Sequence, residues 1–318
     1  MRTKEIIRGY VRKFPPPVKF VLKRIRYVYW NVRDYYKEWQ LNLLKHHFKR
    51  RYATYLYRKQ LGREINWKHP KDLNEKINWL AFCTDTSEWS RLADKYLVRE
   101  YVKERGCGEI LVPFYAKYDG VESIRYEELP EKFVLKTNNA SGDTIVVKNK
   151  SVIDRDRIAE RLQNSLNSKF GLESAEPHYL RINQCIIAEK FLEPQNGELT
   201  DYKIWCFHGK PFCIFTCTNR SITNHTADYN LFDTSWKSID YGLSPQFRNK
   251  KHIDAPMHLD KMLEYASKLS EGFPQVRVDL YEVDGKIYFG EMTFTSMMGR
   301  MQYFTPEYLL RMGEQIHL

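Results

Sequence analysis

Two acidic residues near the end of the chain have the chemistry of a metal site. Asp279 and Glu291 lie in two β-rich runs, residues 276–283 and 286–293, joined by an Asp-Gly dipeptide that is typical of hairpin turns. Mg²⁺ prefers oxygen ligands, and a site built from two carboxylates leaves positions for phosphate oxygens and water. The alternative interpretation is an ordinary surface hairpin.

The register of this hairpin decides whether the two carboxylates meet. A two-residue turn places Asp279 and Glu291 on opposite faces of the hairpin. A three-residue loop with Gly285 left-handed pairs Arg277 with Glu291, and it puts both carboxylates and Thr293 on one face. Arg277 would then hold charge beside them. The predicted Mg²⁺ site therefore requires the three-residue loop.

A loop of small and polar residues is a second candidate site. It joins two β-rich runs, residues 133–137 and 144–148, and contains Ala140, Ser141 and Gly142. Small side chains let backbone N–H groups approach an anion closely. Lys136, at the end of the first run, can reach the same phosphates. The alternative is a plain hairpin with an exposed lysine.

The apolar run that begins at Ile186 is a third candidate site. It ends in Glu189, Lys190, Phe191 and Leu192, just before a proline. An adenine ring needs an acceptor for its amino group, a backbone N–H and apolar walls, and a strand end of this composition supplies all three. The signal is weak by itself, because many strand ends look similar.

The elements that must position these residues belong to a body that begins near residue 67. Residues 87–105 predict one helix, ended by Gly106, and residues 152–169 and 259–269 predict two more. Short β-rich runs alternate with these helices. The body is therefore predicted to be α+β.

The residues before this body predict a basic leader of two helices. The three prolines at 15–17 can start the first helix, apolar residues recur at helical spacing from Val18 to Val32, and the second helix covers about residues 35–57. Such helices with Trp and Tyr suit an anionic membrane surface. Plain docking of the helices on the body is the alternative. Nucleic acid is disfavoured, because no RNA- or DNA-binding motif is present.

The net charge of +11 is concentrated in this leader. Residues 1–63 contain 18 Lys and Arg against three acidic residues, a balance of +15, so the remainder of the chain carries −4. The sequence contains no run of about 18 apolar residues, so no membrane-spanning helix is predicted. Basic residues interrupt each apolar stretch near the N-terminus that could serve as the core of a signal peptide. We expect a cytoplasmic protein that binds the inner face of the cell membrane through residues 1–63.

The six cysteines indicate a reducing compartment and no metal centre. None of them forms a CxxC pair or a zinc-like spacing with histidine. Cys213 and Cys217 lie in an apolar run and are predicted to be buried free thiols.

Taken in chain order, these motifs resemble the ATP-grasp superfamily, and most closely its TupA-like branch. The resemblance runs from about Trp67 to Tyr308. No single phrase is specific, but eight in the correct order are. They are Leu73-Asn-Glu-Lys76-Ile, Ala93-Asp94-Lys95-Tyr-Leu-Val-Arg99, Phe133-Val-Leu-Lys136, Ile187-Ala-Glu189-Lys190-Phe-Leu192, Asp201-Tyr-Lys203, Phe207-His-Gly209-Lys210-Pro211, Arg277-Val-Asp279 and Phe289-Gly-Glu291-Met-Thr293-Phe.

The resemblance implies a role for each candidate residue. Lys95 and Lys136 would contact the phosphates of ATP, and Ser141 and Gly142 would belong to the loop that closes over them. The adenine hinge would be Glu189, Lys190, Phe191 and Leu192. Asp201 and Lys203 would lie at the ribose or the γ-phosphate, and Lys203 and Arg277 are the candidate catalytic residues. Asp279, Glu291 and Thr293 would bind Mg²⁺.

The resemblance also implies an ATP-grasp fold, in which two α+β subdomains sandwich ATP. The predicted parts are a leader at 1–66, the start of the body at 67–130, a subdomain with the phosphate loop and hinge at 131–195, and a subdomain with the Mg²⁺ hairpin at 196–318. Two positions depart from the family pattern. Thr293 stands where these enzymes usually have Asn, and Asn139-Ala140 stands where the branch commonly has His-Gly.

The predicted function is that of an ATP- and Mg²⁺-dependent carboxylate–amine ligase of surface polysaccharide biosynthesis. Its partners would be a carboxylated glycan or lipid-linked sugar precursor and an amine or amino acid. A glycosyltransferase, a sugar kinase and a non-catalytic assembly factor are the alternatives. Asp154-Arg-Asp156 matches the Asp-x-Asp motif of glycosyltransferases, but its place at the start of a predicted helix favours helix-start acidity instead.

Overall fold

The structure is a computed structural model that describes residues 15–139, 142–194, 199–219, 227–249 and 253–318. The chain divides into two compact units, Met1–Tyr52 and Ala53–Leu318. Each unit is described by itself.

The first unit consists of helix in its described part. Helix α2 (Pro16–His47) starts with proline in its first turn, as the sequence predicts. Helix α3 (Lys49–Leu61) begins after Phe48, and its residues from Ala53 onward belong to the second unit. The expected start of a second helix near residue 35 is wrong, because α2 continues through that position. No proline or glycine marks the break at Phe48, so the local sequence gives no signal for it.

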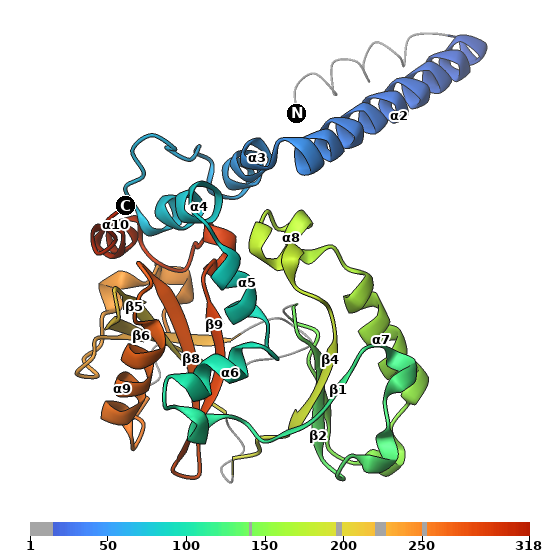
Figure 1. Ribbon diagram of the computed structural model, residues 1–318. Coiled ribbons are helices and arrows are strands. Elements are labelled where there is room, and N and C mark those ends of the chain that lie inside the picture. Colours follow the sequence, from blue (N-terminus) through green and yellow to red (C-terminus); the bar gives the residue numbers. More distant parts are fainter. Residues whose placement is uncertain (1–14, 140–141, 195–198, 220–226, 250–252) are drawn as a thin grey trace. The chain divides into compact units, whose positions relative to one another are not determined.

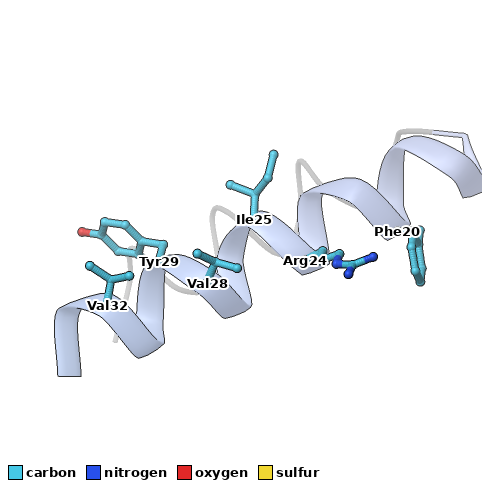
Figure 2. Close-up of a pocket in the computed structure, with 6 residues that line it drawn as sticks. All are labelled: Phe20, Arg24, Ile25, Val28, Tyr29 and Val32. Atoms are coloured by element: carbon cyan, nitrogen blue, oxygen red, sulfur yellow. The ribbon is translucent and has the colours of Figure 1, made fainter. Parts of the chain in front are cut away.

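Helix α2 carries apolar side chains that are open to solvent. Figure 2 shows them along the helix together with Arg24. They are Phe20, Ile25, Val28, Tyr29 and Val32, and all five are exposed. None of the helices in the described part of the chain combines the length and the apolar character that a membrane span requires.

The second unit contains two antiparallel sheets, seen face to face across the lower half of Figure 1. The first has the order β1-β4-β2-β3. Its strands are β1 (Phe114–Tyr118), β2 (Phe133–Thr137), β3 (Ile145–Val147) and β4 (Ile186–Lys190). The predicted hairpin around the small-residue loop is confirmed, because β2 pairs with β3 in antiparallel fashion.

Helix α7 (Arg155–Asn167) packs against β2 and covers the core of this first sheet. The helix predicted over residues 152–169 is therefore confirmed. Asp154 is its N-cap and accepts a hydrogen bond from the backbone N–H of Arg157 at 3.0 Å. This contact confirms the helix-start interpretation of Asp154-Arg-Asp156.

The second sheet has the order β7-β6-β5-β8-β9. Its strands are β5 (Asp201–Phe207), β6 (Lys210–Thr218), β7 (Asp228–Phe232), β8 (Val276–Val283) and β9 (Lys286–Thr293). Helix α9 (Leu259–Ser270) packs on β5, β6 and β8, as its amphipathic pattern predicts. Cys213 and Cys217 are buried free thiols on β6, which confirms that prediction.

The β8–β9 hairpin has a register that the sequence analysis did not consider. The turn has two residues, Asp284 and Gly285, both with positive φ, and Val283 pairs with Lys286. A β-bulge then shifts the pairing, so that Asp279 lies directly opposite Glu291. The predicted three-residue loop is wrong, but the bulge has the same consequence of bringing the two carboxylates together.

The described part of the second unit also contains the α-helices α4 (Leu73–Cys83), α5 (Ser87–Ala93), α6 (Val98–Glu104), α8 (Phe170–Glu173) and α10 (Pro306–Glu314). The single helix predicted over residues 87–105 is wrong, because it is divided at residues 94–97. The two sheets with their surrounding helices confirm the α+β class.

Candidate active site

A cavity of about 710 Å³ is lined by residues of both sheets. Its charged lining residues in the described chain are Lys95, Lys136, Asp143, Glu176, Glu189, Lys190, Asp201, Lys203, Arg277, Asp279 and Glu291. All predicted site residues within the described chain line this cavity. Ser141 lies outside the described residues.

Strands β5 and β8 contribute a buried ion pair to the floor of the cavity. Lys203 lies directly opposite Asp279 in the register, and Lys203 Nζ is 2.6 Å from Asp279 Oδ2 and 2.6 Å from Asp201 Oδ2. Burial opposes the charged form of Lys203, but the carboxylates of Asp201 and Asp279 raise its pKa above the ordinary value. Lys203 is therefore a cation at neutral pH.

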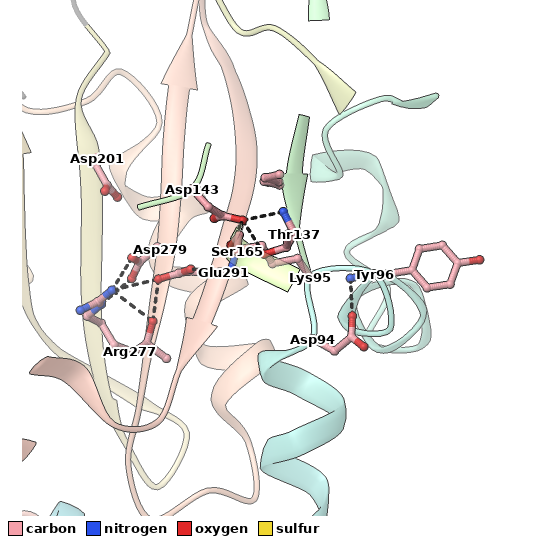
Figure 3. A network of polar contacts seen from close by, with 12 residues as sticks. Asp94, Lys95, Tyr96, Thr137, Asp143, Ser165, Asp201, Arg277, Asp279 and Glu291 are labelled. Carbon is pink, nitrogen blue, oxygen red and sulfur yellow. Dashed lines mark hydrogen bonds and ion pairs between the residues drawn. The ribbon is translucent and has the colours of Figure 1, made fainter. Parts of the chain in front are cut away.

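Arg277 binds Asp279 through two parallel hydrogen bonds. Its Nε donates to Asp279 Oδ1 at 2.6 Å and its Nη2 to Oδ2 at 2.7 Å, as Figure 3 shows. Nη1 donates to Ser296 Oγ at 2.9 Å, and Nη2 also lies 3.1 Å from Thr293 Oγ1. This network fixes the guanidinium in one orientation.

Glu291 faces Asp279 from β9 and is the most open carboxylate of this cluster. Thr293 Oγ1 donates to Glu291 Oε1 at 2.9 Å, and Lys95 Nζ lies 4.0 Å from Oε2. Burial acts to raise the pKa of Glu291, but the charges of Lys95, Arg277 and Lys203 prevail and lower it to about 2. Glu291 is ionised throughout the physiological range.

Lys95 reaches the cavity from the break between α5 and α6. Asp94 Oδ1 accepts hydrogen bonds from the backbone N–H groups of Tyr96 and Leu97, and its Oδ2 accepts from Asn138 Nδ2 at 2.8 Å. The backbone N–H of Lys95 donates to Asn138 O at 3.0 Å. These contacts are the physical reason why the predicted single helix is divided.

Lys136 is held by Glu189 on the neighbouring strand of the first sheet. Lys136 Nζ is 2.6 Å from Glu189 Oε2, and Arg99 Nη1 is 3.1 Å from Oε1. Both oxygens of Glu189 are therefore occupied by cations. Sequence reasoning missed Arg99, although it ends one of the family-like phrases.

The small-residue loop is anchored at its base by Asp143. The Asp143 carboxylate accepts hydrogen bonds from the backbone N–H of Thr137 at 2.7 Å, from the Thr137 hydroxyl and from the Ser165 hydroxyl. Gly142 has a φ of +84°, a conformation that favours glycine. Gly142 and Asp143 both line the cavity.

The predicted hinge lies at an apolar part of the cavity. Leu192 and Tyr281 pack against a small cluster of Val112, Val283 and Tyr288. Phe191 lies under the ammonium group of Lys148, at 5.7 Å from the ring centre. The backbone N–H of Lys190 donates to Pro113 O at 2.9 Å, and its side chain is exposed.

The donor set on β8 and β9 fits Mg²⁺ only together with a phosphate ligand. Glu291 offers Oε2, whose nearest cation is 4.0 Å away, whereas both oxygens of Asp279 are engaged by Arg277 and Lys203. Within the described ranges, no three His, Cys, Asp or Glu side chains are grouped so as to hold a metal ion. Mg²⁺ characteristically binds one or two carboxylates and completes its shell with substrate phosphates and water.

Sequence reasoning missed one end of the cavity entirely. Glu176, Thr295, Met297 and Met298 line it, and the Thr295 hydroxyl donates to Glu176. Met297, Met298 and Gly299 all have positive φ, which is rare for methionine. The sequence signal that points to this end of the cavity is the family-like phrase that begins at Leu73.

Asn74 of that phrase and Asn78, the residue that follows the phrase, hold the left-handed turn from α4. Asn74 Nδ2 donates to Met301 O at 3.0 Å, the Met301 backbone N–H donates to Asn74 Oδ1 at 2.9 Å, and Asn78 Nδ2 donates to Gly299 O at 3.0 Å. A Cβ on Gly299 would lie 2.3 Å from Asn78 Nδ2, so this position requires glycine.

The polar segment of residues 219–251 contributes partly to the cavity. Tyr229 and Phe247 line it, whereas Arg248 Nε donates to Leu243 O at 2.8 Å. Arg220 and His225 of this segment lie outside the described residues.

Comparison with known proteins gives one family and a set of distant structural similarities. The model of the family described as TupA-like ATPgrasp matches residues 75–317. No curated protein matches the sequence.

Among solved structures, D-alanine–D-alanine ligase from Bacillus anthracis complexed with ATP is 15% identical, with a TM-score of 0.41, and the similarity covers 77% of this chain and 66% of that one. The ATP-grasp ligase PsnB complexed with minimal precursor is 11% identical, with a TM-score of 0.38 and coverages of 76% and 67%. N5-Carboxyaminoimidazole synthetase from Staphylococcus aureus complexed with ADP is 16% identical, with a TM-score of 0.34 and coverages of 63% and 43%. The chain thus spans about two thirds of the length of the first two.

Proposed function

The chain belongs to the TupA-like ATP-grasp family, and from this premise we propose that it is an ATP- and Mg²⁺-dependent ligase that joins a carboxylate to an amine. The finer part of the proposal is that the carboxylate belongs to a precursor of a surface polysaccharide. This part rests on the resemblance of the branch to proteins of teichuronopeptide, capsule and O-antigen synthesis.

The observation that carries the proposal is the convergence of four cations on one cavity. Lys95 comes from the connection between α5 and α6, and Lys136, Lys203 and Arg277 come from β2, β5 and β8; all four line it together. Phosphoryl transfer needs positioning and neutralisation of charge more than a protein nucleophile. A cavity with this charge pattern suits a triphosphate.

The proposed reaction has two steps. An oxygen of the substrate carboxylate attacks the γ-phosphorus of ATP, the bond to the β–γ bridging oxygen breaks, and ADP leaves. The amine nitrogen then attacks the acyl carbon, the bond from that carbon to the phosphate oxygen breaks, and inorganic phosphate leaves. Lys203 and Arg277 would stabilise the charge on the phosphoryl group during its transfer.

Glu291, Asp279 and Thr293 are the proposed holders of Mg²⁺. When bound there, Mg²⁺ would neutralise charge on the phosphate oxygens. Lys203 and Arg277 keep Asp279 in place and balance its charge, so the chain's own part is to orient oxygen donors before nucleotide arrives.

The adenine ring is proposed to lie on the apolar part of the cavity. Leu192, Val112 and Tyr281 would form its walls, and the Phe191–Leu192 backbone would offer polar groups. Glu189 would serve mainly to hold Lys136, because its two oxygens already contact Lys136 and Arg99. Asp201 is proposed to orient Lys203. The phosphates are proposed to contact Lys95, Lys136 and the loop that contains Ser141 and Gly142.

Two rival activities differ from the ligase in what they consume and release. A glycosyltransferase would turn over a nucleotide sugar without ATP. The Asp-x-Asp match in this chain, Asp154-Arg-Asp156, lies at the start of α7, where Asp154 caps the helix. A sugar kinase would release ADP and no free phosphate. A ligase releases ADP and phosphate only when carboxylate and amine are both present.

Thermal unfolding with and without Mg·ATP tests the nucleotide site. Mg·ATP at about 100 times its dissociation constant stabilises the folded state by roughly 2.7 kcal/mol, which raises the midpoint visibly. Glu291→Gln should reduce this rise, because the amide lacks the charge that Mg²⁺ requires. Glu122→Gln, the same change at an exposed position, is the control and should behave like the wild type. An equal Mg·ATP shift in wild type and Glu291→Gln would remove Glu291 from the metal site, and no shift in the wild type would reject the proposal.

The first unit supports a further part of the proposal, association with an anionic membrane surface at the cytoplasmic face. Helix α2 carries seven Lys and Arg against two acidic residues, together with exposed apolar and aromatic side chains. Basic amphipathic helices of this kind bind anionic lipid through electrostatic attraction and through burial of their apolar side chains. Vesicle binding of the full chain tests this part.

A further inference from the structure

The end of the cavity at Glu176 contains a buried carboxylate that the proposed phosphate chemistry does not use. Glu176 precedes the short helix η5 (Pro177–Arg181) and is 4% exposed. Its Oε1 accepts a hydrogen bond from the Thr295 hydroxyl, whereas Oε2 has no hydrogen-bond partner among the described residues. A buried polar atom without a partner is costly in a folded protein.

Glu176 differs in this respect from the carboxylates near the proposed phosphate site. Glu189, Asp201, Asp279 and Glu291 each lie within 4.0 Å of a Lys or Arg nitrogen. In the described part of the chain, no basic group lies that close to Glu176. The Arg300 guanidinium acts on Glu176 only weakly, because it donates to Gln60, Ser174 and Met298 instead.

Burial therefore prevails at Glu176 and raises its pKa to about 7, although Thr295, Ser174 and Arg300 favour the ionised form. The free carboxyl is then neutral in a large fraction of molecules at neutral pH. An ammonium ligand that donates an N–H to Oε2 would supply the missing hydrogen bond together with a counter-charge, and it would shift the carboxyl to the ionised form.

Two observations connect Glu176 to the proposed reaction centre. Thr295, its partner, follows Glu291 and Thr293 at alternate positions, and all three line the cavity. Tyr179 feels both Glu176 and Glu291, since burial and then these two carboxylates raise its pKa well above the ordinary value. Glu176 is thus near the cluster, and among the described residues none of the cluster's cations lies within 4.0 Å of its carboxylate.

The backbone at Met297 and Met298, which line the same cavity as Glu176, is held in an unfavourable conformation. Met297 and Met298 have φ of 46° and 57°, left-handed conformations that are unfavourable for residues with a side chain. Such strain tends to occur where a ligand contacts the chain. The two methionines add apolar surface to this end of the cavity.

We propose that this end of the cavity, formed by Glu176, Thr295, Tyr179, Met297 and Met298, is the binding site for the amine acceptor, with Glu176 as the partner of its ammonium group. The inference rests on the proposed ligase function and specifies which part of the cavity takes the second substrate. Glu176 Oε2 accepts a hydrogen bond from the ammonium nitrogen, and the methionines contact its carbon substituent.

Glu176 also receives a proton in this arrangement. The bound ammonium group gives one proton to Glu176, and the neutral nitrogen forms the new bond to the acyl carbon. The bond from that carbon to the phosphate oxygen breaks, and the departing phosphate takes the second proton from nitrogen. The separation from Lys95, Lys203 and Arg277 matters because those cations would repel an ammonium ion.

Infrared difference spectroscopy on the full chain with Mg·ADP tests the inference, with methylammonium chloride as the probe. At about pH 6, below the pKa of about 7, the wild type should show a protonated-carboxyl band that Glu176→Gln lacks. Saturating methylammonium should abolish this band, whereas tetramethylammonium, which has no N–H, should leave it. Glu173→Gln, an exposed glutamate three residues away, is the matched control. Glu176→Gln should bind methylammonium at least about tenfold more weakly.

Calorimetry of the wild type in two buffers gives a second readout that does not depend on the variant. Methylammonium binding should release up to one proton near pH 6 and none well above the pKa of Glu176. A band that persists at saturating methylammonium, or binding without proton release, would overturn the inference. If Mg·ATP still stabilises the protein in that case, the nucleotide site stands and only the acceptor site is rejected.

Discussion

His178 lies two residues after Glu176, and burial acts on the two side chains with opposite sign. His178 is fully buried, and neither ring nitrogen has a hydrogen-bond partner within the described chain. Burial, and to a lesser degree the charge of Arg181, lowers its pKa to about 3, whereas burial raises the pKa of Glu176 to about 7. Burial of His178 therefore lowers the free energy of unfolding as pH falls from about 6.5. Burial of Glu176 lowers the free energy of unfolding as pH rises from about 4.5.

Replacing His178 by Phe should remove one of these pH dependences. The unfolded chain binds a proton at this histidine below pH 6.5 but the folded chain does not, so the wild type loses up to about 1.4 kcal/mol per pH unit. We expect His178→Phe to gain about 2 kcal/mol relative to the wild type between pH 7 and pH 5. Urea unfolding at both pH values measures this, and the ring contact to Trp89 at 5.8 Å is kept.

The exposed His69 provides the control for that measurement, since His69→Phe should leave the pH dependence unchanged. If the free energies of unfolding of wild type and His178→Phe differed by the same amount across this range, His178 would take up a proton in the folded state as readily as in the unfolded chain.

At the same scale, sequence predicts charged site residues only where their neighbours form a pattern. Lys136, Asp279 and Glu291 stand at strand ends or in a hairpin, so their placement in the cavity could be predicted. Glu176 stands in no such pattern, and its partner Thr295 is 119 positions away in the chain. A contact of that kind depends on how the two sheets are arranged, which local sequence does not encode.

At the scale of elements, two irregularities position the site. The bulge in β9 occurs at Gly290, where a Cβ would lie 2.9 Å from the Tyr281 ring and 3.0 Å from Asp279 O. An isolated glycine within a strand is a known sign of a bulge. Gly290 is therefore the sequence signal for the observed pairing of Asp279 with Glu291, and the turn residues Asp284 and Gly285 alone do not predict this pairing.

The break between α5 and α6 is the second irregularity, and it depends on Asp94. The apolar spacing of residues 87–105 fits one helix, so periodicity could not predict the break. The buried Asp94 carboxylate accepts three hydrogen bonds, two from backbone N–H groups and one from the Asn138 side chain. These bonds direct Lys95 toward the cavity.

Asp94→Ala should destabilise the protein and weaken nucleotide binding together. Three donors would lose their acceptor, and we expect a loss of about 2–3 kcal/mol in the free energy of unfolding. The stabilisation by Mg·ATP should also fall, because Lys95 would no longer be fixed. Asp85→Ala is the matched control, since Asp85 accepts similar bonds from Ser87 N and Oγ at an exposed position and should cost well under that amount. Equal losses in the two variants would contradict this account.

At the scale of the whole molecule, charge is distributed according to the two compact units. Residues 1–52 contain 15 Lys and Arg against three acidic residues, a balance of +12, so the second unit, which carries the cavity and both sheets, has a balance of −1. The order of strands within each sheet is not apparent in the sequence, because it follows from pairing between distant segments. The class of fold and the helical leader could be predicted, since both follow from periodicity and composition.

The leader extends into the second unit, which changes how its membrane role must be tested. Gln60 and Arg63 belong to that unit, where Gln60 Nε2 donates to Arg300 O at 2.8 Å and Arg63 Nη1 to Glu75 Oε1 at 2.8 Å. Deleting residues 1–63 would remove these contacts along with α2. Substitutions in the full chain avoid this problem.

We expect the full chain to co-sediment with phosphatidylglycerol vesicles and not with phosphatidylcholine vesicles, because each Lys or Arg near an anionic surface contributes about 1 kcal/mol. Replacing Ile25, Val28 and Val32 of α2 by Ser should weaken this binding, since these exposed side chains would otherwise enter the lipid interface. Val152→Ser, at an exposed apolar position of the second unit, should bind like the wild type. High salt should reduce binding further by screening the charges. Equal binding of the triple variant and the wild type would show that apolar insertion plays no part, and binding to neither kind of vesicle would reject the membrane surface as a partner.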